Sequence, residues 1–176
     1  MASPIIDGYS IRLAKAEDIE AYRELRLEAL KNHPTTFGQD YEDVAALDNK
    51  YWENTLKIVT KEKALFFAEN NSQLIGMTGV YRNLSKKSRH GATAWGVYVR
   101  PDWRGKRISE TLIRACLGWA KEQQITIVRL AVVTNNISAV RCYERCGFII
   151  FGTEPKAIYY DGVYYDEYLM SIEIGY

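Results

Sequence analysis

Two hydrophobic periods divide the chain into predicted strands and helices. Short alternating or continuous apolar runs predict strands, and apolar residues three and four positions apart predict amphipathic helices. The predicted strands are Tyr9–Leu13, Ala64–Glu69, Leu74–Tyr81, Ala94–Val99, Thr126–Val133, Phe148–Tyr160 and Val163–Ile174. The predicted helices are Ala16–Lys31, Ala45–Val59, Lys106–Gln123 and Ile137–Cys146.

Turn residues separate these elements. The segment Asn70–Ser72 is rich in residues that tolerate left-handed backbone angles, so the strands on its two sides should form a hairpin. Asp161-Gly162 joins the last two strands in the same way. Gly147 is a good left-handed cap for the helix before it, and Asn32–Pro34 ends the first helix.

The order of the elements predicts the sheet. The segment from Ala94 to Val133 is strand, helix, strand, which predicts a βαβ unit with parallel strands and a right-handed crossover. The other strands are joined by short turns and should be antiparallel. We therefore predict an α/β fold with a mixed, mostly antiparallel sheet, one parallel pair and helices on both faces. Ligands favour the carboxyl ends of parallel strands, which is where Arg100–Ser109 lies.

A basic, glycine-containing turn joins the strand Val97–Val99 to the next helix. The turn reads Arg104-Gly105-Lys106-Arg107-Ile108-Ser109. Open backbone N–H groups at a helix start, with the positive end of the helix dipole, form an anion site. The alternative is that Arg104 and Lys106 are solvated surface charges.

A second motif follows the strand Thr126–Val133. Asn136, Ala139 and Tyr143 stand about one and two turns apart on one helical face, before Gly147-Phe148. Two simpler interpretations remain open. Asn136 can be only a helix cap, and Tyr143 can be a packing residue with an exposed hydroxyl.

These two motifs, in this order and separated by one strand, resemble the GNAT family of acetyl-coenzyme A-dependent N-acetyltransferases. The family's phosphate loop is usually written Gln/Arg-x-x-Gly-x-Gly/Ala, and here Arg104 opens it. Arg107 stands where glycine is usual, and Ser109 where glycine or alanine is usual. With ordinary helical angles, the Arg107 amide can still point at a phosphate while its side chain turns outward. The resemblance implies one N-acetyltransferase domain, residues 1–176, with its core at about 9–174.

The resemblance also implies a co-substrate, acetyl-coenzyme A, and no metal. In the family the two parallel strands splay apart beside a bulge, and the pantetheine arm pairs with strand backbone in the gap. Here that assigns Val97 and Val99 as main-chain partners. The residues implied to bind the coenzyme are Val97, Tyr98, Val99, Arg104, Gly105, Lys106, Arg107, Ile108, Ser109, Asn136, Ala139 and Tyr143. Tyr143 is further implied as the general acid that protonates the leaving thiolate.

Acetyl transfer to an amine also needs a neutral nucleophile. A lysine-like amine with a pKa near ~10.4 is neutral only about once in 2,500 molecules at pH 7. A base or a water chain must therefore remove a proton. The strand Ala94–Val99 contains no carboxylate, so the candidates lie elsewhere: Glu28, Asp40, Glu69, Asp166 and Glu167. A water route past backbone carbonyls is an equal alternative.

The acceptor pocket should lie between the first two helices and the C-terminal hairpin. The hairpin carries a crowd of tyrosines that can form a pocket wall or simply pack: Tyr159, Tyr160, Tyr164, Tyr165 and Tyr168. The segment Arg26–Leu30, followed by Pro34 and Phe37, resembles the acceptor side of family members that acetylate small molecules or amino termini. It does not choose between these two acceptor classes.

Composition narrows the remaining possibilities. The chain has 176 residues, 47% of them hydrophobic and 26% charged, which is ordinary for one globular domain. A net charge of +1 gives no reason to expect nucleic acid or a membrane as partner. The basic cluster Arg82–His90 is interpreted as a solvated loop, with contact to a coenzyme phosphate or an acidic substrate as the alternative. A homodimer is left open.

Three cysteines fit a reducing compartment, and we expect a cytoplasmic protein. Cys142 and Cys146 stand four apart on one predicted helix, but neither His33 nor His90 is near them in sequence. Packing is thus a better interpretation than a metal site. The competing functional hypothesis is a non-catalytic acyl-coenzyme A sensor, against which the intact Tyr143 argues.

Overall fold

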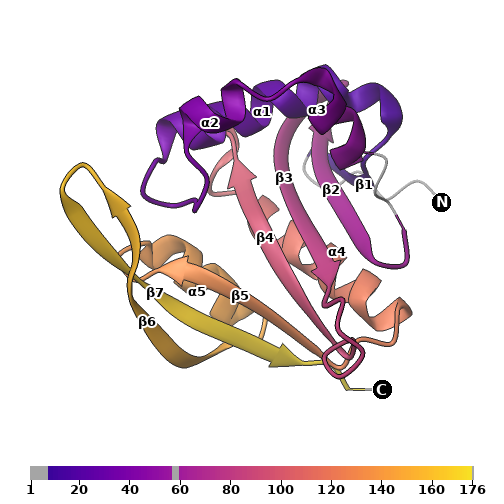
Figure 1. The fold of residues 1–176 in the computed structure, drawn as a ribbon. Coiled ribbons are helices and arrows are strands. Elements are labelled where there is room, and N and C mark those ends of the chain that lie inside the picture. Colours follow the sequence, from indigo (N-terminus) through magenta and orange to yellow (C-terminus); the bar gives the residue numbers. More distant parts are fainter. Residues whose placement is uncertain (1–7, 57–59, 176) are drawn as a thin grey trace.

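One seven-stranded sheet forms the centre of the molecule (Figure 1). The computed structural model describes residues 8–56 and 60–175. The strand order is β1-β2-β3-β4-β5-β7-β6. The strands are β1 (Ser10–Leu13), β2 (Lys63–Asn70), β3 (Gln73–Arg82), β4 (Gly91–Val99), β5 (Ile127–Val133), β6 (Ile149–Tyr160) and β7 (Val163–Glu173). The α-helices are α1 (Ile19–Asn32), α2 (Tyr41–Ala45), α3 (Asn49–Leu56), α4 (Ile108–Glu122) and α5 (Ile137–Arg145).

β4 and β5 form the parallel pair, and every other neighbouring pair in this sheet is antiparallel. Their pairing extends only from Gly91–Ile127 to Thr93–Arg129. Beyond that point the two strands diverge toward their carboxyl ends (Figure 1). The predicted α/β fold, a mostly antiparallel sheet with one splayed parallel pair, is confirmed.

A bulge in β4 lies next to this divergence. Met77 of β3 pairs with Tyr98, whereas Gly79 pairs with Trp95, so β4 contains one more residue than β3 between these pairs. Gly96, within the bulge, has a φ of +66°. A glycine with positive φ is a common way to accommodate an extra residue in a strand. The bulge turns the end of β4 away from β5.

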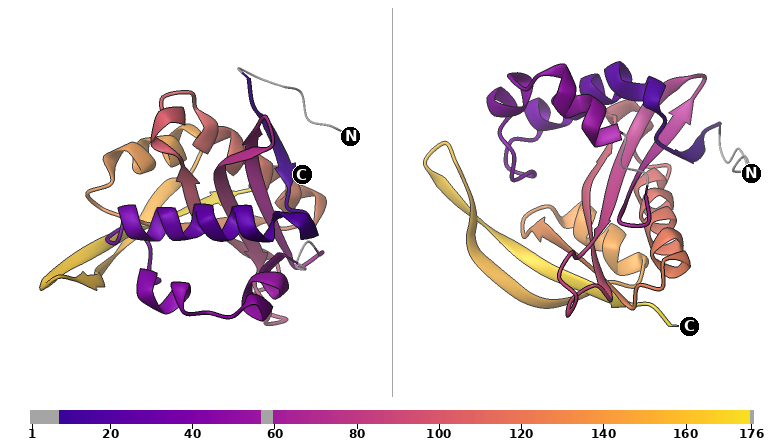
Figure 2. Two further views of the ribbon diagram at one scale, coloured as in Figure 1. Left: turned by 90° about the horizontal axis from the view of Figure 1, so that it is seen from above. Right: turned by 45° about the vertical axis from the view of Figure 1, so that its right-hand side comes forward.

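Helices cover both faces of the sheet, as predicted (Figure 2). The alternation of β2 separates two apolar clusters. Leu65 and Phe67 pack with α1 and α3 residues, and Phe66 and Ala68 pack with residues of α4 and α5. The cluster of α1 and α3 centres on large buried side chains such as Trp52. Both clusters fix the ends of β4 and β5 between two helical layers.

The predicted helix Ala45–Val59 is wrong in its boundaries. Within that range the chain forms α3, and a separate short helix, α2, precedes it and shares only Ala45 with the prediction. The Asp40 carboxylate accepts a hydrogen bond of 2.8 Å from the Glu42 amide and begins α2. The Asp48 carboxylate accepts one of 3.0 Å from the Tyr51 amide and begins α3. Two aspartate caps therefore override the single apolar stripe, whose last residues, 57–59, lie outside the described part of the chain.

The hairpin of β6 and β7 extends away from the rest of the molecule (Figure 1). β6 forms one edge of the sheet. Within residues 8–56 and 60–175, no helix has both the length and the apolar character needed to cross a membrane.

Candidate active site

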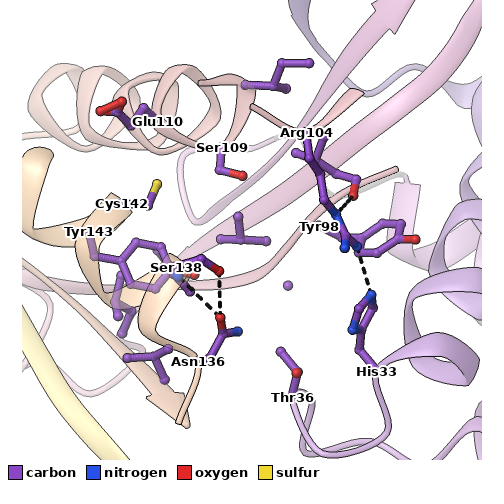
Figure 3. A pocket seen from close by; sticks show the side chains of 18 of the residues that line it. His33, Thr36, Tyr98, Arg104, Ser109, Glu110, Asn136, Ser138, Cys142 and Tyr143 are labelled. Atoms are coloured by element: carbon purple, nitrogen blue, oxygen red, sulfur yellow. Dashed lines mark hydrogen bonds between the residues drawn. The ribbon is translucent and has the colours of Figure 1, made fainter. Parts of the chain in front are cut away.

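A cavity of about 840 Å³ opens where β4 and β5 diverge, between the start of α4, the start of α5 and the segment after α1 (Figure 3). Most of the predicted coenzyme-binding residues line it. These are Val97, Tyr98, Val99, Arg104, Gly105, Arg107, Ile108, Ser109, Asn136, Ala139 and Tyr143. Lys106 does not, and its ammonium lies 4.5 Å from the centre of the Trp103 ring.

The start of α4 is open toward the cavity. Arg107 is the N-cap residue with φ +57° and ψ 23°, and its side chain makes no capping hydrogen bond. The ordinary helical angles considered for Arg107 from the sequence are therefore not the ones it adopts. The residue adopts the left-handed conformation that a glycine adopts easily. Gly105, two residues earlier, also has a positive φ of +81°.

This geometry fits a phosphate group. The first amides of α4 have no capping side chain from Arg107, and a helix start attracts anions through its dipole. The guanidinium groups of Arg104 and Arg107 belong to the same cavity wall. The arrangement therefore suits the pyrophosphate of the coenzyme that the sequence implies.

Asn136 caps α5. Its side-chain oxygen accepts hydrogen bonds from the Ala139 amide at 3.3 Å and from the Ser138 hydroxyl at 3.1 Å (Figure 3). The capping role considered from the sequence is present, and the same residue lines the cavity. The cap holds the first turn of α5 with Ala139 toward the gap between the strands.

Tyr143 lies one turn further along α5. Its side chain is 7% exposed, lines the cavity and stacks at 6.2 Å from the Phe148 ring. Burial raises the pKa of the Tyr143 phenol above its ordinary value of 10.0, with smaller contributions from Cys142 and Cys146. The hydroxyl therefore stays protonated at neutral pH.

Tyr98 contributes to the cavity from β4, and its side chain also bonds to α1. Its hydroxyl donates a hydrogen bond of 2.8 Å to Glu28 Oε1. Burial and this bond to Glu28 raise the pKa of Tyr98 to about 12. The other Glu28 oxygen lies 3.4 Å from Arg100 Nε. The Glu28 carboxylate is thus engaged on both oxygens.

None of the five candidate general bases lines the cavity. Besides Glu28, Asp40 caps α2, Glu69 pairs with Arg12, and Asp166 accepts from the Lys156 amide. Burial and the nearby Glu154 raise the pKa of the Glu167 carboxylate. The one carboxylate among the described lining residues is Glu110, whose Oε1 lies 3.0 Å from Arg145 Nε.

His33 is a lining residue that the sequence did not mark as part of the site. Its Nε2 lies 2.9 Å from Arg104 Nη2, and Arg104 Nε donates to the Val99 carbonyl at 3.1 Å (Figure 3). Burial and the charge of Arg104 lower the pKa of His33. In the sequence, His33 stands directly after α1 and beside Pro34, in the segment expected on the acceptor side. In the structure this segment and the carboxyl end of β4 line the same cavity.

The hairpin tyrosines do not line this cavity. Tyr159 and Tyr164 stack on each other at 4.8 Å near the exposed tip, and Tyr168 packs against the core. The basic loop lies at the amino end of β4, opposite the cavity, where Arg89 pairs with Glu62. The described residues contain no group of three potential metal ligands, and all three cysteines are free and buried.

Comparisons with known proteins place these features in context. The model of the acetyltransferase (GNAT) family matches residues 19–148. An uncharacterized N-acetyltransferase of Methanocaldococcus jannaschii is 27% identical over 146 residues, 82% of this chain and 62% of that protein. The chain therefore spans less than two thirds of this relative.

Solved structures share the fold. The acetyltransferase of the GNAT family from Streptococcus pneumoniae superposes with a TM-score of 0.84 at 23% identity, covering 95% of this chain and 99% of that chain. The yncA protein of Salmonella typhimurium, solved with its cofactor acetyl-CoA, gives a TM-score of 0.81 at 18% identity, with 96% and 95% covered.

Proposed function

Because the chain belongs to the acetyltransferase (GNAT) family, we propose that it transfers an acetyl group from acetyl-coenzyme A to a primary amine of a small molecule or peptide. The acceptor attacks directly, and Tyr143 is the general acid. The proposed unit is a single domain with its core at about residues 9–174.

The observation that carries this proposal is a single cavity that joins an open helix start to a buried tyrosine. The α4 start, the gap between β4 and β5, and Tyr143 all border the same 840 Å³ space. An anion at the α4 start and a reacting group near Tyr143 are then linked by one continuous channel. A long ligand with a phosphate end and a thioester end suits that shape.

Each wall has a proposed task. The amides of Gly105–Ser109 and the Arg104 guanidinium bind the pyrophosphate. The backbone of β4 at Val97 and Val99 pairs with the pantetheine arm, because the bulge at Gly96 turns this part of β4 away from β5. Acetyl-coenzyme A supplies an acetyl group already activated as a thioester.

Tyr143 acts on the departing sulfur. A thiolate has a pKa near ~8.5 and a phenol near ~10, so complete proton transfer to it is uphill by about 2 kcal/mol. Burial of Tyr143 increases this difference. The hydroxyl therefore stabilises the sulfur first by donating a hydrogen bond while negative charge develops, and the proton released by the acceptor nitrogen makes the overall transfer favourable.

Loss of the acceptor proton is assigned to water. The five carboxylates considered from the sequence lie outside the cavity wall, and Glu110 is paired with Arg145. Water that enters the open cavity can carry the proton past the backbone carbonyls of β4.

A thiol-release assay tests this function. The full chain is mixed with acetyl-coenzyme A and a panel of amines, amino acids, polyamines and peptides, while calorimetry and thermal unfolding measure coenzyme binding. Binding with acceptor-dependent thiol release supports the enzyme. Binding without turnover on any acceptor supports the sensor, and absence of binding at millimolar coenzyme contradicts both.

A further inference from the structure

A buried guanidinium lies beside the acceptor end of the cavity. Arg26 of α1 is 5% exposed. Its Nη2 donates a hydrogen bond of 2.8 Å to Gln39 Oε1, but its Nη1 is buried and has no hydrogen-bond partner within the described residues. A buried donor without a partner is uncommon and calls for an explanation.

Arg26 also lacks a counter-ion. No carboxylate among residues 8–56 and 60–175 forms an ion pair with it. Burial lowers the pKa of Arg26, and the only nearby titratable groups that oppose this are Tyr22 and Tyr51. A buried cation is normally compensated by an anion. Here that anion is missing from the described chain.

The surroundings of the guanidinium connect it to the cavity. Its central carbon lies 4.9 Å from the Phe37 ring centre and 5.8 Å from that of Trp95. Nη1 lies 3.7 Å from the place where a Cβ at Gly96 would stand. Phe37, Trp95 and Gly96 all line the cavity. These residues therefore lie both against Arg26 and on the cavity wall, and Gly96 contributes no side chain there.

The arginines that line the cavity belong to the proposed coenzyme end, around the start of α4 and the end of α5. Arg104, Arg107 and Arg145 line it, against the single carboxylate of Glu110. Glu110 Oε1 is 3.0 Å from Arg145 Nε, and its Oε2 is 3.9 Å from Arg107 Nε. Because Arg104 is proposed to bind the coenzyme pyrophosphate, and Arg107 and Arg145 lie near Glu110, a charge on the acceptor is left to Arg26.

We propose that the acceptor is a primary amine that also carries a carboxylate, such as an α-amino acid, and that this carboxylate lies against the Gly96 bulge opposite Arg26. The proposal rests on the proposed acetyl transfer. Arg26 then has an opposite charge near it, across the Gly96 backbone, only when the acceptor is bound, and it selects acidic over neutral amines. Its aromatic neighbours hold the guanidinium in place while the site is empty.

The test compares L-amino acids with the corresponding L-amino acid amides. The amide lacks the negative charge but presents the same side chain and amine. The two amines differ in pKa, so the informative quantity is how a substitution changes the ratio of kcat/KM for acid to amide. For the unchanged protein we expect a ratio of at least about 10 at saturating acetyl-coenzyme A.

Three variants define the role. Arg26→Met keeps much of the apolar stem and should lower the ratio at least about 10-fold, mainly through a higher KM for the acid. Arg26→Lys keeps the charge and should restore part of the preference. Lys31→Met removes an exposed charge from the same helix and should leave the ratio unchanged. Coenzyme affinity and thermal unfolding report whether each variant is folded.

The outcomes separate the two proposals. Wild-type protein whose kcat/KM, corrected for the fraction of neutral amine, is higher for amides or polyamines than for acids overturns the carboxylate proposal, even if no Arg26 variant folds. A folded Arg26→Met protein with an unchanged acid-to-amide ratio overturns it as well. Absence of both coenzyme binding and thiol release overturns the proposed acetyl transfer itself.

Discussion

Arg104 donates a hydrogen bond of 2.9 Å from Nη2 to His33 Nε2 across the cavity entrance. Arginine has no acceptor atom, so the imidazole nitrogen must be the acceptor, and the ring proton stands on Nδ1. The contact ties the segment after α1 to the loop before α4. It exists only while His33 is neutral.

The titration of His33 should reflect this contact. Burial and Arg104 lower the pKa of His33 below 6.5, so its NMR titration midpoint should lie under that value. In Arg104→Met the midpoint should rise toward 6.5, without reaching it while burial remains. His90→Gln assigns the signals, since the chain has two histidines. An unchanged midpoint in Arg104→Met would show that the charge of Arg104 does not lower the pKa of His33.

The same shift has a consequence for stability. The unfolded state binds the His33 proton more readily, so the free energy of unfolding should fall as pH decreases from about 6.5 through the folded-state pKa of His33. His33→Gln should remove this part of the pH dependence. Urea unfolding between pH 5 and pH 8, compared for the two proteins, measures it.

Replacing Tyr143 by Phe should slow the chemical step about 10- to 1,000-fold, because water replaces the hydroxyl only in part. Coenzyme affinity and the melting temperature should change little. Single-turnover thiol release isolates chemistry from product release. Tyr81→Phe, at a half-exposed position on β3, is the control. An unchanged chemical rate in Tyr143→Phe would leave this residue a packing role only.

The left-handed conformation of Arg107 predicts a contrast between two substitutions. Such a conformation costs a non-glycine residue about 1–3 kcal/mol, most for β-branched side chains. Arg107→Gly should therefore be more stable than Arg107→Val by at least about 1 kcal/mol in denaturant unfolding. Equal stability of the two variants would show that residue 107 is not held in this conformation.

Gly79 is expected to be essential for the position of Trp95. A Cβ at Gly79 would stand 2.3 Å from Trp95 Cε2, an impossible contact, so Gly79→Ala must displace the indole. Because Trp95 lines the cavity, acceptor KM should rise and stability should fall by about 1–3 kcal/mol. Gly118→Ala, in α4 with open space around it, should be neutral or stabilising. Steady-state kinetics and thermal unfolding compare the pair.

Local patterns in the sequence predicted most of the sheet and the parallel pair. Strand periodicity and short turns depend on neighbouring residues, so Thr126–Val133 was recognised as β5 within one residue. The short helix α2 and the later start of α3 were missed because the caps at Asp40 and Asp48 decide where these helices begin. The left-handed angle at Arg107 could not be read from a residue type that rarely adopts it.

For the cavity wall, too, residues on one element were predicted better than residues brought together by tertiary packing. The family resemblance carried by the two motifs implied most of the lining residues on β4, α4 and α5, because each motif lies on one element or the turn beside it. His33 and Trp95 reach the cavity through tertiary packing between distant segments, for which the sequence offers no period. For the hairpin tyrosines the sequence left a pocket wall and simple packing open, and none of the five lines this cavity.

The short pairing between β4 and β5 also leaves much of the backbone of these two strands without a partner strand between them. Three residue pairs at one end join strands whose other ends stand apart. Backbone amides of β4 and β5 that face the gap between the strands should therefore exchange readily with deuterium. A ligand bound in this gap would slow the exchange, and it would also make the connection between the two halves of the sheet more rigid.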